Sequence, residues 1–427
     1  MKIRNLILAG LAICTMASCS KDEAVDIYAN GPVDATLSFN AVASVEMKGA
    51  DYGSEDNGRG NEAKVKTLDV YIFKEGALQV YKNYTVEPGK DNLLTSDFMI
   101  SHLTVKKAKE SEHFVMYLVA NCVRISDARL EDFQTKSIAG EITDYELGGY
   151  MPMVGKVEFD SKDIKPLVDE EGKWWENWIS DKNIYYQSSD NDKEHNELAK
   201  PTGYSSILLT RVISRVQVES LTVDLVDNEQ GNASFALRRL SLVNVPKNVT
   251  VGADGIIPWI KTYESGSFGE KDHEIISKRD NENCTFLEKV NLLNNPLTKT
   301  YDNQLSGNVT FNDSNKFYAY TFPNNEGLIA TTVNGITEAK NYKTILLISG
   351  LYKATANDPG SLKQFRIPIE TPGKGNIVEP NHIYLVTVKI TGQGSSNEDG
   401  YESNAHVSAT IKIAPWKVVI QEEEDAN

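Results

Sequence analysis

The stretch DATLSFNAVASVEMK, residues Asp34–Lys48, alternates apolar and polar side chains, with Val42 as its one exception. Successive side chains of a β-strand point to opposite faces. The stretch therefore predicts one strand of about 13 residues and ~43 Å, half-buried, with its polar face toward solvent. Its apolar face carries Ala35, Leu37, Phe39, Ala41, Ala43, Val45 and Met47.

A polar, glycine-rich segment, KGADYGSEDNGRGNEAK (residues 48–64), comes after this predicted strand. Segments of this composition are preferred sites of proteolytic nicking. The longest alternating strand of the chain thus precedes a segment that a protease would readily cut.

The first residues have the pattern of a secretory signal. Lys2 and Arg4 precede the thirteen-residue apolar run LILAGLAICTMAS, which is too short to span a bilayer. The run ends in MASC, which resembles a lipoprotein signal-peptidase box and predicts that Cys19 carries a diacylglyceryl group. The alternative is an ordinary signal peptide cut at Ala17 or Ser18. With the lipid in place, the mature chain is attached to a membrane and does not cross it.

Composition limits the partners. The chain has 427 residues and a formal net charge of −16, which becomes −18 once Lys2 and Arg4 leave with the signal. An acidic chain of this kind argues against nucleic acid and anionic lipid headgroups as partners. Its 40 % apolar content is enough for two domain-sized cores.

Beyond the signal and the anchor, two cysteines remain, Cys122 and Cys284. Cys122 comes directly after the apolar run FVMYLVAN, which is typical of a buried strand. We interpret the two as lone buried thiols, with a disulfide between them as the alternative.

Strand-like runs rich in Val, Ile, Tyr and Thr recur along the chain, bounded by Gly, Pro, Asn and Asp. They predict a mainly β protein with two β-sandwich-like (transthyretin-like) domains in tandem and minor helix. The best helical candidates are residues 130–142 and, more weakly, 283–293.

The polar stretch 169–203 alternates little and is expected to divide the chain into two halves. The predicted division is signal 1–18, anchor, first strand and cleavable loop 19–59, N-terminal domain 60–205, C-terminal domain 206–405 and tail 406–427.

No pattern of catalytic residues appears. The chain contains no HExxH, GxSxG, GxxxxGK[ST] or CxxC motif, and its six histidines are scattered without i, i+4 pairing. The acidic runs SEDNG, SSDNDKEHNE and SNEDG lack the spacing of a calcium loop and are interpreted as solvated loops. The sequence thus predicts no enzyme, no cofactor and no metal site.

One aromatic cluster is a candidate for sugar binding. Trp174, Trp175 and Trp178 lie close to Tyr185 and Tyr186 and beside carboxylates. Exposed rings of this kind stack on sugars, whereas the commoner arrangement packs them against their own domain.

The order of several blocks resembles the type V pilins, or fimbrillins, the fimbrial-subunit lipoproteins of certain Gram-negative anaerobes. The blocks are the lipobox, the alternating strand and VKTLDVYIF, then LVAN (118–121), MPMVG (151–155), LTRVISRVQV (209–218), NHIYLVTVKI (381–390) and IKIAPWKVVI (411–420). The last block and ISRV look closest to the branch that forms minor fimbriae.

The resemblance implies a mechanism of assembly. The first strand would act as a temporary plug that a surface protease removes together with the anchor. A C-terminal strand of another subunit would then fill the open groove, and repetition would build a fibre at the cell surface. The partners would be copies of the chain and related fimbrial subunits, with the outer membrane contacted only through the lipid. The donor face would carry Val407, Ala409, Ile411 and Ile413, then Trp416, Val418 and Ile420 after a kink at Pro415.

The cut site departs from the family pattern, because Lys48 stands where the family has an Arg directly after the plug. Arg59 is the only Arg between Arg4 and Arg124. Arg59–Gly60 is therefore the favoured bond and Lys48–Gly49 the alternative, while an uncut subunit at the base of a fibre is the third possibility.

Two other classes of function remain as alternatives: a surface glycan-binding lipoprotein and a lipoprotein enzyme.

Overall fold

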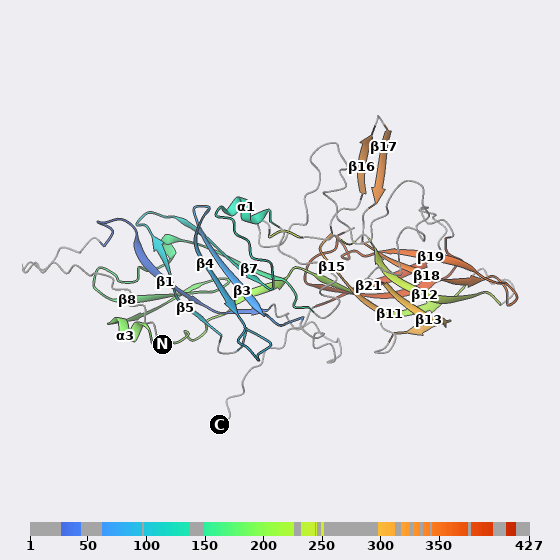
Figure 1. The fold of residues 1–427 in the computed structure, drawn as a ribbon, viewed down its shortest axis with the longest axis horizontal. Helices are drawn as coiled ribbons and strands as arrows, with labels where there is room; N and C mark the ends of the chain where they lie inside the picture. The colour runs from blue at the N-terminus through green and yellow to red at the C-terminus, as the bar shows by residue number, and fades with distance from the viewer. Residues whose placement is uncertain are drawn as a thin grey trace, which may run out of the picture.

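The computed structural model describes residues 27–43, 62–95, 98–136, 149–225, 232–243, 245, 249–251, 298–311, 317–324, 328–333, 336–341, 344–374, 377–395 and 407–415. Two β-domains succeed one another along the long axis of the molecule (Figure 1). The predicted fold class, mainly β with tandem sandwiches and minor helix, is confirmed.

The N-terminal domain consists of two sheets. One has the strand order β5-β1-β8-β9 and the other β2-β10-β7-β6-β3-β4. Its strands are β1 (Val33–Phe39), β2 (Ala41–Ala43), β3 (Thr67–Lys74), β4 (Ala77–Thr85), β5 (Ile100–Lys107), β6 (His113–Ala120), β7 (Met153–Asp160), β8 (Trp174–Ile179), β9 (Ile184–Ser189) and β10 (Ile207–Arg211).

Short helices complete this domain. They are α1 (Leu130–Gln134), the 3-10 turn η1 (Ser161–Asp163) and α3 (Asp192–His195). The predicted helix over residues 130–142 is confirmed only for its first five residues. Its residues from 137 onward, and the weaker candidate 283–293, lie outside the described part of the chain.

The C-terminal domain also pairs two larger sheets. One has the order β14-β11-β20-β21, with β15 also on β11, and the other has the order β13-β12-β18-β19. A separate hairpin, β16-β17, projects from this domain (Figure 1). The strands are β11 (Ser214–Val223), β12 (Ser234–Val243), β13 (Thr298–Ser306), β14 (Val309–Thr310), β15 (Phe317–Thr321), β16 (Leu328–Val333), β17 (Ile336–Asn341), β18 (Ile345–Lys353), β19 (Ser361–Pro368), β20 (His382–Ile390) and β21 (Val407–Pro415).

The opening stretch is not one continuous strand. It is divided at Asn40 into β1, which pairs with β5 and β8, and β2, which pairs with β10 in the other sheet. The chain therefore crosses from one sheet of the sandwich to the other within the stretch. The expected solvent-facing polar side is also wrong, because Thr36 and Ser38 are as buried as their apolar neighbours.

The polar stretch 169–203 forms a hairpin and not a divider. Its strands β8 and β9 pair from Trp174 opposite Ser189 to Ile179 opposite Ile184. The alternation is hidden because Glu176 and Asn177, in the middle of β8, are polar yet fully buried.

The two domains meet later in the chain than the predicted division at 205/206. β10 pairs with β2 and β7 of the N-terminal domain, whereas β11 pairs with β15 and β20 of the C-terminal domain. Only Val212 and Ile213 separate the two strands, and both are buried. The connection is therefore a packed segment of the core, which is why turn-forming composition does not reveal it.

One continuous cluster of buried apolar side chains extends through both domains. It includes Leu37 and Phe39 of β1 and Val216 and Val218 of β11. None of the helices in the described residues is long and apolar enough to cross a membrane.

The burial of β1 gives a first prediction. Replacing Leu37, which is 0 % exposed, by Asp should lower the free energy of unfolding of the uncut chain by at least ~3 kcal/mol, because the site loses its apolar contacts and must bury a charge. Urea denaturation measures this loss. Val33→Asp, at the half-buried start of the same strand, serves as the control and should cost much less. Equal stability of the Leu37→Asp protein and the parent would show that β1 is not packed as described.

Candidate functional site

The candidate site is the groove that β1 occupies between β5 and β8. β1 runs antiparallel to β5, from Val33 opposite Lys107 to Phe39 opposite Ile100. On its other side it runs parallel to β8, with Leu37 opposite Asn177. β5 and β8 are not neighbours in the sheet, because β1, the first of the described strands, fills the position between them.

The apolar face of this segment lies against the core. Its members in the described residues are almost fully buried: Ala35, Leu37 and Phe39 are 0 % exposed, Ala41 is 4 % and Ala43 is 5 % exposed. Full burial of side chains such as Leu37 and Phe39 is worth about 1.5–3 kcal/mol each. Val45 and Met47 of the predicted plug lie outside the described residues.

The polar face of β1 is opposite a β-bulge in β5. Leu37 pairs with Leu103 and Phe39 with Ile100, so Ser38 faces two residues of β5. One of these, His102, has a left-handed backbone with φ 55° and donates its N–H to Ser38 Oγ at 3.1 Å. Non-glycine residues seldom adopt this conformation, and such strain concentrates at functional sites.

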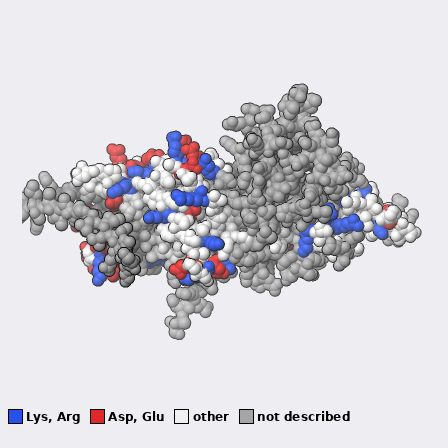
Figure 2. All heavy atoms as spheres, viewed as in Figure 1, with Lys and Arg blue, Asp and Glu red and all other residues white. Residues whose placement is uncertain are grey.

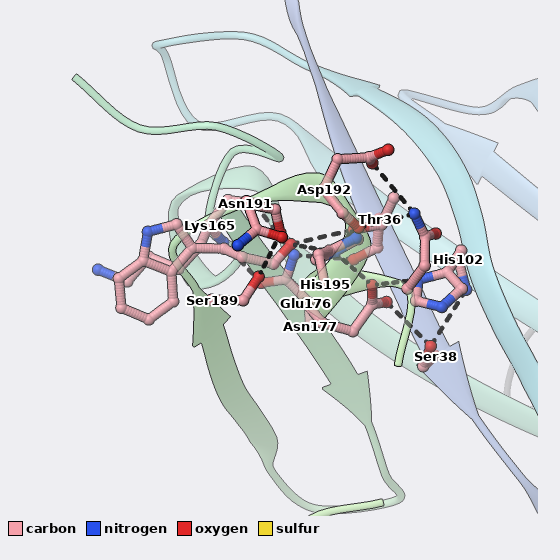
Figure 3. A network of polar contacts seen from close by, with 12 residues as sticks. Thr36, Ser38, His102, Lys165, Glu176, Asn177, Ser189, Asn191, Asp192 and His195 are labelled. Atoms are coloured by element: carbon pink, nitrogen blue, oxygen red, sulfur yellow. Dashed lines mark hydrogen bonds and ion pairs between the residues drawn. The ribbon is translucent and has the colours of Figure 1, made fainter. Parts of the chain in front are cut away.

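Glu176 of β8 lies at the centre of this polar face (Figure 3). Its side chain is 0 % exposed, and its Oε1 accepts a hydrogen bond of 2.9 Å from Ser38 Oγ. Its Oε2 lies 2.8 Å from His102 Nδ1 and 2.9 Å from His195 Nε2. One buried carboxylate thus joins β1, β5 and α3.

The short helix α3 positions His195. The helix is capped by the Asn191 side chain, which accepts a hydrogen bond from Glu194 N at 2.9 Å. The imidazole is buried, and its Nε2 lies 3.1 Å from the Trp175 carbonyl and 3.4 Å from Thr36 Oγ1. Thr36 in turn donates to the same carbonyl at 3.0 Å, so this contact also involves β1.

Asn177, the residue after Glu176 in β8, also holds β1 through its side-chain amide. Asn177 Nδ2 donates to the Thr36 carbonyl at 2.9 Å and to the Lys165 carbonyl at 3.0 Å, while its Oδ1 accepts from Lys165 N at 2.7 Å. The buried amide therefore has partners for both of its polar atoms, as buried polar groups require.

Tyr204 contacts the point where the chain crosses between the sheets. Its hydroxyl donates to the Ile179 carbonyl at 2.6 Å and accepts from Asn40 N at 3.2 Å. Burial raises the pKa of Tyr204 above its ordinary value, so the phenol stays protonated. The Asn40 carbonyl accepts from Ile207 N at 2.9 Å, which begins the pairing of β2 with β10.

At the start of β1 lies a buried cation. Lys107, opposite Val33, donates from Nζ to the Ile164 carbonyl at 2.6 Å. Burial lowers the pKa of Lys107, and the nearby charge of Lys165 lowers it further.

On the face shown in Figure 2, the described Lys and Arg residues of the N-terminal domain are interspersed with Asp and Glu.

Glu62, the first described residue after the favoured cleavage bond Arg59–Gly60, lies at the junction of the domains. It is 1 % exposed, and its carboxylate accepts from Arg215 Nη1 at 2.8 and 3.0 Å and from the Tyr320 hydroxyl at 2.5 Å. Its carbonyl accepts from Arg211 Nε at 2.8 Å. Arg211 belongs to β10 and Arg215 to β11, so Glu62 joins both domains to the end of the cleavable segment.

The predicted donor strand is docked on its own domain. β21 pairs antiparallel with β20 at nine positions, from Val407 opposite Ile390 to Pro415 opposite His382, at the edge of its sheet. Val407, Ile411 and Ile413 are half-buried and Ala409 is exposed. The remaining predicted site residues lie outside the described part of the chain: Trp416, Val418, Ile420, Cys19, Lys48 and Arg59.

The tryptophans are held within their own domain. Trp178 is 1 % exposed and packs edge-on against Tyr204, so its predicted sugar contact is wrong. Trp174 and Trp175 are half-buried, and Trp175 Nε1 donates to Asp169 Oδ2 at 2.8 Å. Cys122 is a free thiol, whereas Cys284 lies outside the described residues.

His102, Glu176 and His195 were missed by sequence reasoning. These residues are up to 93 positions apart in the chain, and no local motif connects them. The one available signal was a Glu inside the aromatic strand WWENWI, because a charge at a core position needs a partner.

Comparison with known proteins agrees with this architecture. Residues 35–201 match the profile of the family described as Major fimbrial subunit protein (FimA). This segment is therefore similar to the FimA fimbrial-subunit family. The matching segment begins within β1 and contains β5, β8 and α3, so it includes the polar contacts of β1 with Glu176, His102 and His195. The predicted fimbrillin relationship is confirmed.

Solved structures show the same fold over nearly the whole chain. A putative cell adhesion protein from Parabacteroides distasonis matches with a TM-score of 0.56 and 14 % identity, covering 91 % of this chain and 98 % of its own. A fimbrilin (fimA) from Porphyromonas gingivalis matches with a TM-score of 0.54 and 16 % identity, covering 91 % and 99 %. A further Parabacteroides distasonis putative cell adhesion protein has a TM-score of 0.54 and 17 % identity, covering 90 % and 100 %. No curated protein matches the chain.

The junction gives the second prediction. Glu62→Gln removes the negative charge that lies against Arg215 and should lower the free energy of unfolding by about 3–5 kcal/mol, because a buried cation then lacks this carboxylate. Guanidinium denaturation measures the change. Asp91→Asn removes an exposed ion pair with Lys64 and is the matched control, with no measurable effect expected. A Glu62→Gln protein as stable as that control would show that the junction does not depend on the ion pair.

Proposed function

We propose that the chain is a structural subunit of a cell-surface fimbria. It is exported as a lipoprotein anchored to the outer membrane through Cys19, and its partners are copies of itself and related fimbrial subunits. Proteolysis after Arg59, or after Lys48, removes the anchor together with β1 and β2. A C-terminal strand of another subunit then fills the groove, and the resulting fibre supports adhesion.

The observation that carries this proposal is the position of β1. It is the first of the described strands, yet it lies between β5 and β8 and supplies a hydrogen-bonding partner to each. Its removal would leave two rows of backbone groups and an apolar surface uncovered, which is a template for a strand from another chain.

The C-terminal strand has properties that suit the groove. Among the described strands, β21 pairs with β20 alone, and its Ile411 and Ile413 are half-buried. In the groove a donor strand would have two neighbours, each additional ladder hydrogen bond contributing roughly 1 kcal/mol net. A donor drawn from β21 must first separate from β20, whereas one drawn from residues 416–427 leaves β21 in place.

The cut gives the assembly its direction. Exchange of one strand for another is close to neutral in contacts, so loss of the first strand makes the exchange irreversible. Glu62 supports a cut after Arg59, because it would become the third residue of the shortened chain and keep its contacts with Arg215 and Tyr320. Both domains would then stay joined while the groove is empty.

Limited proteolysis tests this function directly. The chain from Ser20 onward, made without lipid, is treated briefly with trypsin and monitored by intact mass and by gels of unboiled samples. We expect loss of residues 20–59, or 20–48, together with a ladder of detergent-resistant oligomers. Lys48→Ala/Arg59→Ala is the control and should stay monomeric. A monomer that resists cutting at both bonds would refute the proposed mechanism.

A substitution in the donor strand gives the third prediction. Ile411→Asp should leave a folded monomer, because this side chain is half-buried, but should abolish the ladder after cutting, since the groove cannot pair a buried charge. Ser361→Asp, at the exposed start of β19 and outside the donor strand, is the control and should polymerise. Normal ladders from Ile411→Asp would exclude β21 as the donor and point to residues 416–427.

A further inference from the structure

Three metal-ligand atoms converge beside β1. His102 Nδ1, His195 Nε2 and a carboxylate oxygen of Glu176 all lie within 4.8 Å of one another. Two imidazoles and one carboxylate are a ligand set of protein zinc sites, which have Zn–N and Zn–O bonds of about 2.0–2.2 Å. Ligand atoms around such an ion lie roughly 3.3–3.5 Å apart, so the 2.8 and 2.9 Å contacts with Glu176 would open by about 0.5 Å. The two imidazole nitrogens, which lie within 4.8 Å of each other, would take the other ligand positions.

The burial of Glu176 calls for a positive charge at this point. The carboxylate is 0 % exposed, and a charge in such a place must be paired or bound to a metal. In the described residues, its ion-pair partners are the two imidazoles, each of which is also a metal ligand when neutral.

The surroundings hold the ligands in place as the outer shell of a metal site does. Ser38 Oγ donates to Glu176 Oε1 and leaves Oε2 toward the histidines. The Trp175 carbonyl and Thr36 Oγ1 lie 3.1 and 3.4 Å from His195 Nε2, so two more oxygen atoms lie next to the candidate ligand atom of His195. His102 meets the cluster from a bulged position of β5 with a left-handed backbone.

The cluster is also accessible. Glu176 and His195 are buried, but the His102 side chain is 25 % exposed, so one ligand of the cluster is in contact with solvent. Figure 3 shows the three side chains meeting beside β1, with His102 on the opposite side of Glu176 from His195.

We propose that His102, Glu176 and His195 form a binding site for a divalent transition-metal ion such as Zn²⁺. The ion ties β5 to β8 and α3 across β1, and it therefore connects the two walls of the groove by a link that does not pass through the first strand. The site depends on the described contacts alone and stands whether or not strand exchange occurs.

Metal titration tests the site. The chain from Ser20 onward, stripped with EDTA, is titrated with ZnCl₂ by calorimetry and with CoCl₂ by visible absorption, which reports the coordination geometry. We expect one saturable Zn²⁺ per chain, Co²⁺ bands of a four- or five-coordinate site, and a higher melting temperature with Zn²⁺ than with EDTA.

Variants assign the ligands. His195→Gln and His102→Asn should lose the saturable binding and the metal-dependent rise in melting temperature. Asn tolerates the left-handed backbone at position 102, so His102→Asn remains folded even if His195→Gln does not. His113→Gln is the matched control, because His113 is an exposed histidine next to Glu158 and Asp160, and it should bind as the parent does.

The opposite results would overturn the site. Absence of saturable binding would show that the cluster is a hydrogen-bonded support of β1 only. Loss of binding in His113→Gln, with binding retained in His102→Asn, would assign the metal to the surface.

Discussion

In the four-stranded sheet of the N-terminal domain, β5 and β8 hydrogen-bond to β1 and not to each other. The continuity of the sheet therefore depends on a strand that the chain enters before any other described element. Among the described elements, none precedes β1 in the chain. The same strand continues as β2 into the opposite sheet, so one short segment completes both layers of the sandwich.

Polar contacts determine how this strand fits. Ser38, Thr36 and the backbone of β1 bond to Glu176, Trp175 and Asn177 on one side and to His102 on the other. A slip of one residue would turn the apolar face of β1 toward these groups and leave buried polar atoms without partners. The polar network thus specifies the register of the strand, while the apolar face supplies most of the attraction.

A separate buried contact holds the two domains together. The Glu62–Arg215 ion pair lies between them and does not involve β1 or β2. Ion pairs of this kind contribute little net stability compared with apolar packing, but the loss of either partner is costly. The junction and the groove can therefore behave independently, because the segment after the cleavable loop stays with the junction.

The sequence alone determined those features that arise from local patterns. The β class and the apolar face of β1 were predicted because side-chain alternation is a property of neighbouring residues. The order of blocks identified the family for the same reason, since each block is local. The break at Asn40, the buried strand β8 and the late connection between the domains were missed, because polar residues such as Ser38, Glu176 and Asn177 are buried there.

Only the tertiary structure decided which of these polar groups are satisfied, and by which partners. Glu62 meets Arg215 across 153 residues, and Glu176 meets His102 across 74. No spacing rule links such pairs, since the chain path between them is set by packing of both sheets. The sequence therefore determined which strand is amphipathic, and the fold determined that its polar face is buried against a cluster of two histidines and a carboxylate.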